Sequence, residues 1–525
     1  MKREFSALAG RHFDLLVCGG GVYGAWTAYD AALRGLNVAI VEQGDWAGAT
    51  SSASSKLIHG GLRYLENYDF KLVRKAIRER QLLLQLAPHR VWPLRFGVPF
   101  YKGSRVGALK LKAGLMLYDF LAGFPDAEFS HRHFNGISFA RRFSALASRD
   151  LQGGFTYGDA QTDDARFVLE LIAGAMAAGA VCVNYCRLTG LNESGGQVCG
   201  ATVLDRSGGM SAQVRARQIV NATGQWIAAS RPGRDWCRLS KGVHIVMPGT
   251  MTPGTMIEEA LLLTAKSDGR VFFIMPWYGM TLIGTTDKDF TGDIDRVVAE
   301  QNEIAYLLDE ANHYLNSAWT ETDIVGSYAG VRVMKRSDKA APSDVSRDWE
   351  LMTAGNGVHY SIGGKLTSAR VDASVIVDRV CAQLGIDIPC TTKDRIFPWA
   401  PEEKYSEWSV TMSNLANRLG IAPEIAKWLI RRHGNRAGEI LRNIEGEPGL
   451  VERIDPTLPF IYADLLHCAS NEMVMHLEDL LRRRMPLLIL ARLSEDKLRR
   501  IAGTVATVMG WDETAINREV AYCLQ

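Results

Sequence analysis

Apolar and polar positions near the N-terminus follow the order strand, helix, strand. Residues 14–18 are a short apolar run, residues 25–33 repeat apolar positions at helical spacing up to Gly35, and residues 38–41 are apolar again. Glycine often ends a helix because it adopts the left-handed conformation without strain. This order predicts a βαβ unit, and therefore a parallel sheet with helices packed on it.

Helical spacing and strand-like runs of apolar residues both occur again later in the chain. Apolar positions recur at helical spacing in 66–86 and 164–179, whereas 181–186, 198–220 and 241–290 alternate and turn like strands. The block at 241–290 is rich enough in strands to suit a substrate domain. The pattern as a whole predicts an α/β protein with a second, β-rich region.

The last part of the chain has a different pattern. A proline-containing stretch at 398–402 has the composition of a linker, and residues 403–525 are almost purely helical in period. Arginines gather on the faces of these predicted helices. We expect the run Arg482–Arg484 to lie on a solvated face, where it could still contact anionic lipid or another subunit.

Composition excludes several classes of protein. The 525 residues allow about two to four domains. The 60 basic and 58 acidic residues leave a formal charge of only +2, which gives no sign of a nucleic-acid partner. None of the nine cysteines forms a CxxC pair, so reduced, buried thiols are expected rather than disulfides or a metal site.

The sequence also bears on location. Residues 1–14 lack the apolar stretch of a secretory signal, and no run reaches the roughly 18 apolar residues that span a bilayer. We expect a protein that is cytoplasmic, or peripheral on the cytoplasmic face of a membrane. Residues 102–122 join four basic residues to an apolar run, which is typical of an interfacial helix. A core helix with a solvated basic end is the alternative.

The βαβ unit carries a dinucleotide-binding motif. Gly19, Gly21 and Gly24 form GxGxxG between the first strand and the helix, and Glu42 ends the second strand. Glycines let backbone amides approach a pyrophosphate at the helix N-terminus, and the acid can accept a hydrogen bond from a ribose hydroxyl. A tight turn without a ligand is the alternative.

Two further segments favour FAD over NAD. Residues 49–61 (ATSSASSKLIHGG) are dense in small hydroxyl side chains, as expected of a loop close to phosphates or a flavin ring, although a flexible serine-rich loop would look the same. The meander ending in Ala222, Thr223 and Gly224 is typical of FAD proteins of the glutathione-reductase type, where such a strand closes over the nucleotide. An ordinary strand and turn is the alternative there.

The run ATSSASSKLIHGGLRYLENYDFKLV at 49–73 resembles the signature of the FAD-dependent glycerol-3-phosphate dehydrogenase family. Residues 403–525 resemble the helical cap domain of that family, so the resemblance covers nearly the whole chain. Five more segments resemble the family in the same order, namely KGVHIV (241–246), IGTTDKDFTGD (283–293), YAGVRV (328–333), SRD (346–348) and GGKLTSAR (363–370).

The resemblance implies a glutathione-reductase-type FAD-binding (Rossmann-like) domain that is discontinuous over 1–100, 150–230 and 325–398. A β-rich, substrate-binding and membrane-facing region would occupy 101–149 and 231–324, and an all-helical cap 399–525. FAD is expected to be bound non-covalently. The residues expected to contact it are Gly19, Gly21, Gly24, Glu42, Thr50, Ser51, Ser52, Ser55, Lys56, His59, Gly60, Gly61, Ala222, Thr223, Gly224, Gly364, Lys365, Leu366 and Thr367.

The resemblance also implies substrate-binding residues. Arg332 and Arg347 match arginines that bind the substrate phosphate, a role that suits the planar, bidentate guanidinium. Arg63 and Tyr64 match positions near the substrate and the flavin, and Arg63 and Arg332 are counted among the catalytic candidates.

Two further catalytic candidates follow from the resemblance. Lys365 matches a lysine beside flavin and substrate, where its charge, with a helix that starts after Gly364, would stabilise negative charge on the reduced ring. His244 matches a histidine near the substrate hydroxyl, where neutral imidazole could take the hydroxyl proton.

The implied activity is oxidation of sn-glycerol 3-phosphate to dihydroxyacetone phosphate, with a hydride passing from C2 to flavin N5 and electrons going to a quinone. A homodimer is compatible with the resemblance. The segment GGKLTSAR departs from the more usual GGKLTTYR at Ala369, and the loop after YAGVRV differs too. Another polyol phosphate, such as erythritol phosphate, therefore stays open as the substrate.

Other functions also stay open at this stage. An oxygen-using glycerol-phosphate oxidase would carry the same motifs. An amine or amino-acid oxidase shares the fold but binds a carboxylate, for which one arginine suffices. A non-catalytic flavin-binding protein and an NAD-dependent dehydrogenase are the remaining alternatives.

Overall fold

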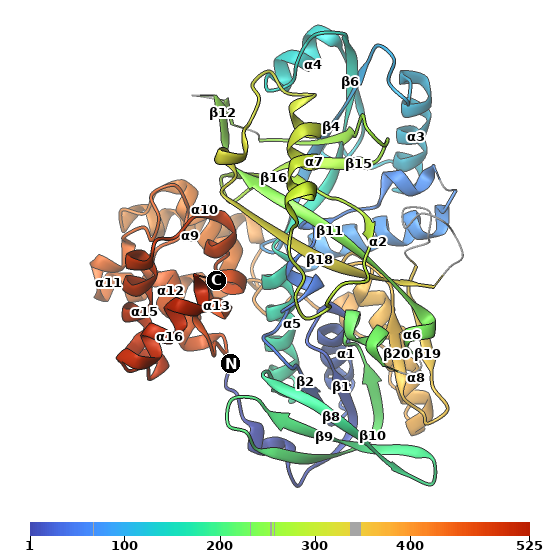
Figure 1. Ribbon diagram of the computed structural model, residues 1–525, viewed down its shortest axis with the longest axis vertical. Helices are drawn as coiled ribbons and strands as arrows, with labels where there is room; N and C mark the ends of the chain where they lie inside the picture. The colour runs from blue at the N-terminus through green and yellow to red at the C-terminus, as the bar shows by residue number, and fades with distance from the viewer. Residues whose placement is uncertain (67, 231–232, 253–254, 257, 337–347, 525) are drawn as a thin grey trace.

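The computed structural model describes residues 1–66, 68–230, 233–252, 255–256, 258–336 and 348–524. Two mixed sheets with their helices lie one above the other in Figure 1, and a separate group of helices from the C-terminal part of the chain lies to one side. The expected α/β class and the all-helical C-terminal domain are confirmed.

The first sheet has a parallel centre, as the βαβ pattern predicted. Strand β1 (His12–Cys18) lies between β10 (Ser211–Asn221) and β2 (Val38–Val41), and all three run in the same direction. The order along the sheet is β19 (Glu350–Thr353), β20 (His359–Ile362), β10, β1, β2 and β7 (Val181–Val183), with β9 (Gln197–Asp205) and β8 (Cys186–Ser194) paired antiparallel beside β10.

Three helices cover this sheet. Helix α1 (Val22–Leu33) packs against α5 (Asp164–Ala177) and α8 (Ala369–Leu384). Asp163 caps α5 by accepting a hydrogen bond from the backbone N–H of Arg166, which is why the helix begins there. The helical patterns at 25–33 and 164–179 are therefore confirmed.

The second sheet is larger and mostly antiparallel. Strand β11 (Cys237–Met247) pairs along its length with β18 (Gly326–Lys335) and at one end with β16 (Met280–Gly284). The order is β17 (Lys288–Asp289), β11, β16, β15 (Val271–Trp277), β14 (Ala260–Thr264), β4 (Val91–Tyr101), β6 (Leu151–Thr162) and β3 (Leu57–Ile58), with β5 (Arg132–Asn135) paired to β6. A hairpin of β12 (Thr250–Thr252) and β13 (Thr255–Met256) stands apart.

The helices around this sheet are α2 (Phe70–Leu86), α3 (Ala108–Leu121), α4 (Gly136–Arg142) and α7 (Gln301–Asn312), while α6 (Gly233–Trp236) lies beside β20 of the first sheet (Figure 1). Helix α3 confirms the helical part of the prediction at 102–122. Among the described residues, none of the helices has both the length and the apolar character needed to cross a bilayer.

The sheets divide the chain differently from the expected ranges. The nucleotide-binding pieces 1–100, 150–230 and 325–398 include β4, β6 and β18, yet these strands are hydrogen-bonded into the second sheet. Local pattern marks a segment as a strand but does not say which partner it pairs with. Pairing joins residues that are far apart in the chain, so only the folded structure defines it.

The C-terminal helices run from α9 (Tyr405–Arg418) to α16 (Glu513–Cys523). Between them lie α10 (Pro423–His433), α11 (Ala437–Gly446), α12 (Tyr462–Asn471), α13 (Leu477–Asp479), α14 (Leu487–Leu490) and α15 (Glu495–Met509). The chain's amino terminus reaches this domain, since the Met1 ammonium donates to the carbonyl of Asn471 at 2.6 Å.

The expectation that Arg482–Arg484 form a solvated face is wrong for two of the three. Arg483 and Arg484 are buried and both bind the carboxylate of Asp45, which follows β2, with Arg483 Nε 2.5 Å from Asp45 Oδ2. The buried carboxylate neutralises the guanidinium groups, so their burial is tolerated. The run therefore docks the C-terminal domain on the first sheet instead of facing solvent.

Candidate active site

A cavity of about 1110 Å³ is lined by residues of both sheets. Cys18, Val41 and Asn221, at or next to the carboxyl ends of β1, β2 and β10, form one wall, and Phe273 and Arg332 of the second sheet form another. Ligands of open α/β sheets bind at the carboxyl ends of the parallel strands. The cavity is therefore the place where a nucleotide is expected.

Glycine is required where the nucleotide motif turns. Gly19 has φ +109°, and a Cβ there would overlap the backbone of Ala222 at the end of β10. A Cβ on Gly20 would overlap the ring of Trp46, and one on Gly24 would overlap the carbonyl of Gly19. These contacts bring loop, helix and strand close together and leave the bare backbone of Gly19 and Gly21 facing the cavity.

Glu42 holds this loop in shape and faces the cavity as well. Its carboxylate accepts the backbone N–H of Gly20 at 2.6 Å and that of Gly44 at 2.8 Å. Burial raises the pKa of Glu42, although both N–H donors oppose that shift. A carboxylate so placed retains lone pairs for a sugar hydroxyl, as the motif predicted.

Some side chains of the serine-rich loop line the cavity, and others are buried in the interior. Thr50, Ser51 and Ser55 line the cavity, and Ser51 Oγ also accepts the backbone N–H of Val22 at 2.9 Å. The carbonyl of Val331 accepts a hydrogen bond of 2.6 Å from the Thr50 hydroxyl, which ties the loop to β18. The loop thus connects the nucleotide motif to the second sheet.

Lys56 points away from the cavity, contrary to the expectation that it contacts the cofactor. Its ammonium is buried, and it donates to the carbonyl of Ser52 at 2.6 Å and to Asp164 Oδ1 at 2.7 Å. The buried Asp164 carboxylate needs a cation nearby, and Lys56 provides it. We therefore leave Lys56 out of the cofactor site.

Arg63 and Tyr64 line the cavity from the segment that follows the serine-rich loop. Gly61 is in the left-handed conformation, with φ +78°, and starts the short 3₁₀ helix Leu62–Leu65 that carries both side chains. The ammonium of Lys365 lies 3.5 Å from the centre of the Tyr64 ring, a close cation–π contact. Tyr64 and Lys365, which were predicted from two motifs far apart in the chain, are therefore in contact.

The turn that carries Lys365 is not the start of a helix. Gly363 and Gly364 have φ +75° and +95°, conformations that a right-handed helix does not contain, and α8 begins only at Ala369. Tyr23 of α1 fixes the turn, because its hydroxyl accepts the backbone N–H of Lys365 at 3.0 Å. The helix expected after Gly364 begins at Ala369, beyond Lys365, so the positive charge at this turn is that of the Lys365 ammonium.

Arg332 projects from β18 across the neighbouring strand. Its guanidinium donates to Thr285 Oγ1 at 2.7 Å and to the carbonyl of Thr286 at 3.2 Å, and it lies 3.4 Å from Asp287 Oδ1. A Cβ on Gly242 of β11 would overlap this guanidinium. These contacts orient the Arg332 guanidinium, which also lines the cavity.

Several cationic side chains line the cavity, among them Arg63, Arg270, Arg332 and Lys365. Asp287 lies among them and bonds the Ser240 hydroxyl as well as Arg332. Such a set of cations favours a doubly charged anion, which is what a phosphate monoester is at neutral pH. The predicted Arg347 lies outside the described residues.

His244 stands behind the wall of the cavity. Only 1% of its surface is exposed, and its Nε2 lies 2.9 Å from the hydroxyl oxygen of Ser55, which does line the cavity. Burial, with further contributions from Arg332 and Lys56, holds the pKa of His244 well below 6.5. The imidazole is therefore neutral near pH 7, as expected, but it does not itself face the cavity.

The cavity brings together most of the predicted residues. The predicted residues that its lining does not include are Gly24, Ser52, Lys56, Gly60 and His244. The predicted residues that line it are Gly19, Gly21, Glu42, Thr50, Ser51, Ser55, His59, Gly61, Arg63, Tyr64, Ala222, Thr223, Gly224, Arg332, Gly364, Lys365, Leu366 and Thr367.

Sequence reasoning did not single out four residues that shape the site. Thr285 and Asp287 orient Arg332, Gly242 gives it room, and Arg270 donates to the backbone carbonyl of Asp287. Three of them lie in the segments KGVHIV and IGTTDKDFTGD, which supported the resemblance. Their membership of these segments was the feature of the sequence that could have identified them as site residues.

These features fit FAD. The glycine loop admits a pyrophosphate only because no Cβ is present, Glu42 suits a ribose hydroxyl, and the serine loop and Lys365 line the same cavity. A cation in that lining suits the negative charge of a reduced flavin. We therefore assign the glycine loop, Glu42 and the Lys365 turn to the cofactor.

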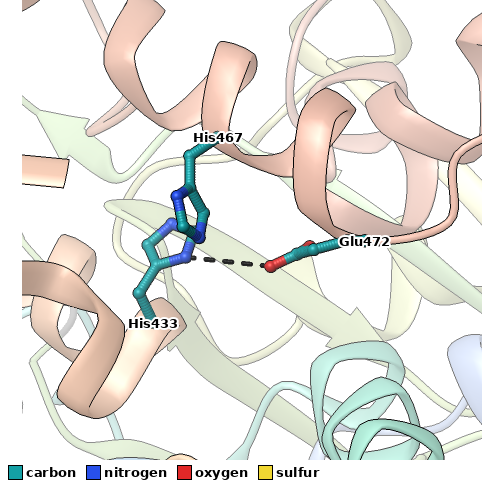
Figure 2. A group of neighbouring side chains, drawn as sticks. All are labelled: His433, His467 and Glu472. Atoms are coloured by element: carbon teal, nitrogen blue, oxygen red, sulfur yellow. Dashed lines mark ion pairs between the residues drawn. The ribbon is translucent and has the colours of Figure 1, made fainter. Parts of the chain in front are cut away.

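A second cluster of polar side chains lies outside this cavity. His433, His467 and Glu472 converge in the C-terminal domain with ligand atoms within 4.8 Å of one another (Figure 2). Their composition suits a metal ion, but the Glu472 carboxylate already accepts from Arg166 at 2.9 Å and from Arg436 at 3.3 Å. These guanidinium groups oppose a cation, so we assign the cluster to contact between the C-terminal domain and α5.

Comparison with known proteins agrees with the geometry. Residues 14–370 match a family described as FAD dependent oxidoreductase, and residues 390–516 match the C-terminal domain of alpha-glycerophosphate oxidase. The chain is 35% identical to a glycerol-3-phosphate dehydrogenase of Synechocystis, over 99% of this chain and 97% of that protein. It is 34% identical to glycerol-3-phosphate dehydrogenase 2 of Mycobacterium tuberculosis, over 98% of this chain and 88% of that protein.

A solved structure is similar over the same range. The glycerol-3-phosphate dehydrogenase of Bacillus halodurans, crystallised in complex with FAD, superposes with a TM-score of 0.79 at 27% identity. The alignment covers 98% of this chain and 95% of that one. Both the two-sheet body and the C-terminal helices therefore have a counterpart in a structure that contains the cofactor.

Proposed function

The chain belongs to the FAD-dependent glycerol-3-phosphate dehydrogenase family, and from this premise we propose that it oxidises sn-glycerol 3-phosphate to dihydroxyacetone phosphate and passes the electrons to a quinone. The observation that carries the proposal is the cavity itself. Its lining combines the dinucleotide loop and Glu42 with the cations Arg63, Arg270, Arg332 and Lys365. A phosphorylated alcohol bound by these cations would share the cavity with the flavin.

Within this proposal the side chains divide the work. Arg332 binds the phosphate, because Thr285 and Asp287 fix its guanidinium while it faces the cavity. Arg63 and Tyr64 bind the substrate beside it, and by the family resemblance Arg347 adds a second phosphate contact. When bound, FAD supplies a ring that takes a hydride from the carbinol carbon. Lys365 then balances the negative charge that results.

The first test is anaerobic mixing of purified protein with sn-glycerol 3-phosphate. The visible flavin absorption band is expected to bleach within the turnover time, because two electrons enter the flavin. Subsequent addition of a soluble quinone analogue is expected to restore the band faster than air does.

Each alternative gives a different result in this experiment. A yellow protein that sn-glycerol 3-phosphate does not bleach, but erythritol phosphate does, would replace the proposed substrate. Restoration by air at least as fast as by quinone would make the protein an oxidase. Bleaching by an amino acid alone would overturn the substrate class.

We also propose that α3 brings the protein to a membrane surface. Leu109 is 83% exposed and Phe120 is 62% exposed, and Met116 and Phe124 are exposed beside them. Lys110 and Lys112 project from the same helix. An exposed apolar surface with adjacent lysines suits an anionic bilayer interface, where an oxidised quinone acceptor would be found.

The membrane proposal predicts binding to vesicles that contain anionic lipid. The double change Leu109→Ser with Phe120→Ser is expected to lower the partition coefficient at least about tenfold, because each large apolar side chain contributes on the order of 1.5–3 kcal/mol when buried. Sedimentation with vesicles measures the partition. Val410→Ser, a change at an exposed apolar position of α9, is the matched control. Equal binding by all three proteins would refute a role for α3.

A further inference from the structure

The hydroxyl of Ser55 connects the cavity to an imidazole that the cavity does not reach. Ser55 lines the cavity, and its oxygen lies 2.9 Å from Nε2 of His244. His244 comes from β11 of the second sheet and is buried. Ser55 is thus the link between a substrate in the cavity and this imidazole.

The imidazole is fixed in place. Its ring stacks on Tyr328 of β18 with centroids 4.8 Å apart and an angle of 14° between the planes. On another side lies Gly284 of β16, where any Cβ would overlap the ring. Strand β11 is paired on both sides, with β16 and β18, so the backbone that carries the ring is held in the sheet.

The second ring nitrogen supports a functional role. Nδ1 of His244 is buried and has no hydrogen-bond partner among the described residues. An unsatisfied buried polar atom destabilises a fold by about 1–3 kcal/mol, so a purely structural histidine would be expected to satisfy it. Retaining such an atom beside a cavity is typical of functional sites.

The charges that face the ring keep it ready to accept a proton. Arg332 of β18 and Lys56 of the serine loop both lower the pKa of His244 in addition to burial, and the Tyr328 hydroxyl is turned away to donate to the carbonyl of Ser54. Lys56 is itself paired with Asp164. Neutral imidazole therefore predominates at physiological pH, with a lone pair available on one nitrogen.

We infer that Ser55 relays the hydroxyl proton of the substrate to His244. As the C2–H electron pair leaves as hydride to FAD, the substrate O–H bond breaks and the C2–O bond becomes a carbonyl. The substrate proton goes to Ser55 Oγ while the Ser55 proton goes to His244 Nε2. The substrate is oxidised, the cofactor is reduced and the imidazole gains one proton. This inference rests on the proposed function and assigns its proton acceptor.

Other polar groups that line the cavity are less suited to accept the proton. Arg63, Arg332 and Lys365 are cations and donate hydrogen bonds only. The Asp287 carboxylate is already bonded to Ser240 and to Arg332. His59 also lines the cavity and is the competing acceptor. Its direct action is the alternative that the experiment must separate from the relay.

The experiment compares Ser55→Ala, Ser55→Thr, His244→Gln and the Ser55→Ala/His244→Gln double variant as FAD-loaded proteins. Anaerobic stopped-flow at saturating substrate is expected to show flavin reduction slowed at least about a hundredfold in Ser55→Ala, the lower range for general-base catalysis. Ser55→Thr keeps a hydroxyl and should recover most of the rate. The double variant should be no slower than the slower single variant, because the two residues act as one unit.

A pH profile separates the relay from a structural role. Without the relay, the reactive species is substrate that has already lost its proton, so the reduction rate of Ser55→Ala should rise about tenfold per pH unit. The wild-type rate should stay nearly flat near neutral pH. Ser413→Ala is the control, because it removes an exposed serine hydroxyl of α9 that lies outside the cavity, and its rate should match the wild type.

The inference is overturned if Ser55→Ala reduces flavin within about threefold of the wild type, or if the losses of the two single variants multiply in the double variant. A large loss in His59→Asn with none in Ser55→Ala would assign the proton to His59. These outcomes all require that wild-type flavin bleaches with sn-glycerol 3-phosphate. If it does not, the proposed function fails, whatever the variants do.

Discussion

Replacing Arg332 with alanine is expected to lower kcat/KM for sn-glycerol 3-phosphate by about ten- to a hundred-fold. A hydrogen bond to a charged group contributes on the order of 1.5–3 kcal/mol, and most of that loss should appear as a higher KM. The guanidinium is fixed by Thr285 Oγ1 at 2.7 Å and faces the cavity, so its removal leaves the phosphate without its pre-oriented partner. Steady-state kinetics with a quinone analogue measures the effect.

Two controls isolate the phosphate from the rest of the site. Arg238→Ala removes a guanidinium from β11, which pairs with β18, but Arg238 bonds Asp289 at 2.6 Å and does not line the cavity. Its kinetics should stay near the wild type. Glycerol lacks the phosphate, so its kcat/KM should be the same in Arg332→Ala and in the wild type. Equal losses for glycerol and its phosphate would show that Arg332 acts elsewhere in the reaction.

Arg332→Lys is a sharper form of the same test. Lysine keeps the charge but cannot make the paired contacts of a planar guanidinium. We expect an intermediate KM, with FAD content unchanged because Arg332 lies outside the nucleotide motif. Wild-type kinetics in this variant would show that charge alone is sufficient.

Replacing Glu472 with glutamine is expected to lower the free energy of unfolding by about 3–5 kcal/mol. The Glu472 carboxylate is fully buried beside His433 and His467 (Figure 2), with Arg166 of α5 as its closest partner. The change keeps the shape of the side chain but leaves a buried guanidinium without its counter-charge. Chemical denaturation, followed by circular dichroism, measures the loss.

The matched control is Glu495→Gln. This residue also pairs with an arginine, Arg499, at 3.3 Å, but its side chain is 61% exposed, so the change should cost at most about 1 kcal/mol. If Glu472→Gln also lowered the free energy of unfolding by at most about 1 kcal/mol, Glu472 would not be the residue that holds the C-terminal domain against α5. A metal chelator is expected to leave the wild-type midpoint unchanged, and a lower midpoint with chelator would restore the metal interpretation of His433 and His467.

Several features of the site follow from local sequence alone. Gly19 has φ +109° and lies close to Ala222, and only glycine is acceptable there. The glycine in the motif therefore predicts the turn. Glu42 follows because it ends the next strand of the same βαβ unit. The helical pattern of 403–525 likewise needs only the spacing of apolar residues.

The position of His244 could not be inferred in the same way. Sequence placed it on a strand near the substrate, but three strands and the Tyr328 ring decide that it lies behind the cavity wall. The role of Ser55 depends on this contact between residues far apart in the chain. Lys56 and Arg484 are similar, since Asp164 and Asp45 determine their burial.

The sequence by itself therefore determined the βαβ nucleotide motif, the β-rich and all-helical regions and the family resemblance, because these depend on short-range spacing and on runs of residue types. Only the tertiary structure decided which sheet each strand joins, which charges are buried as pairs and which predicted side chains reach the cavity. Strand pairing and ion pairing join residues that are hundreds of positions apart, as with Arg166 and Glu472. No local pattern encodes such a contact, since it exists only once the chain has folded.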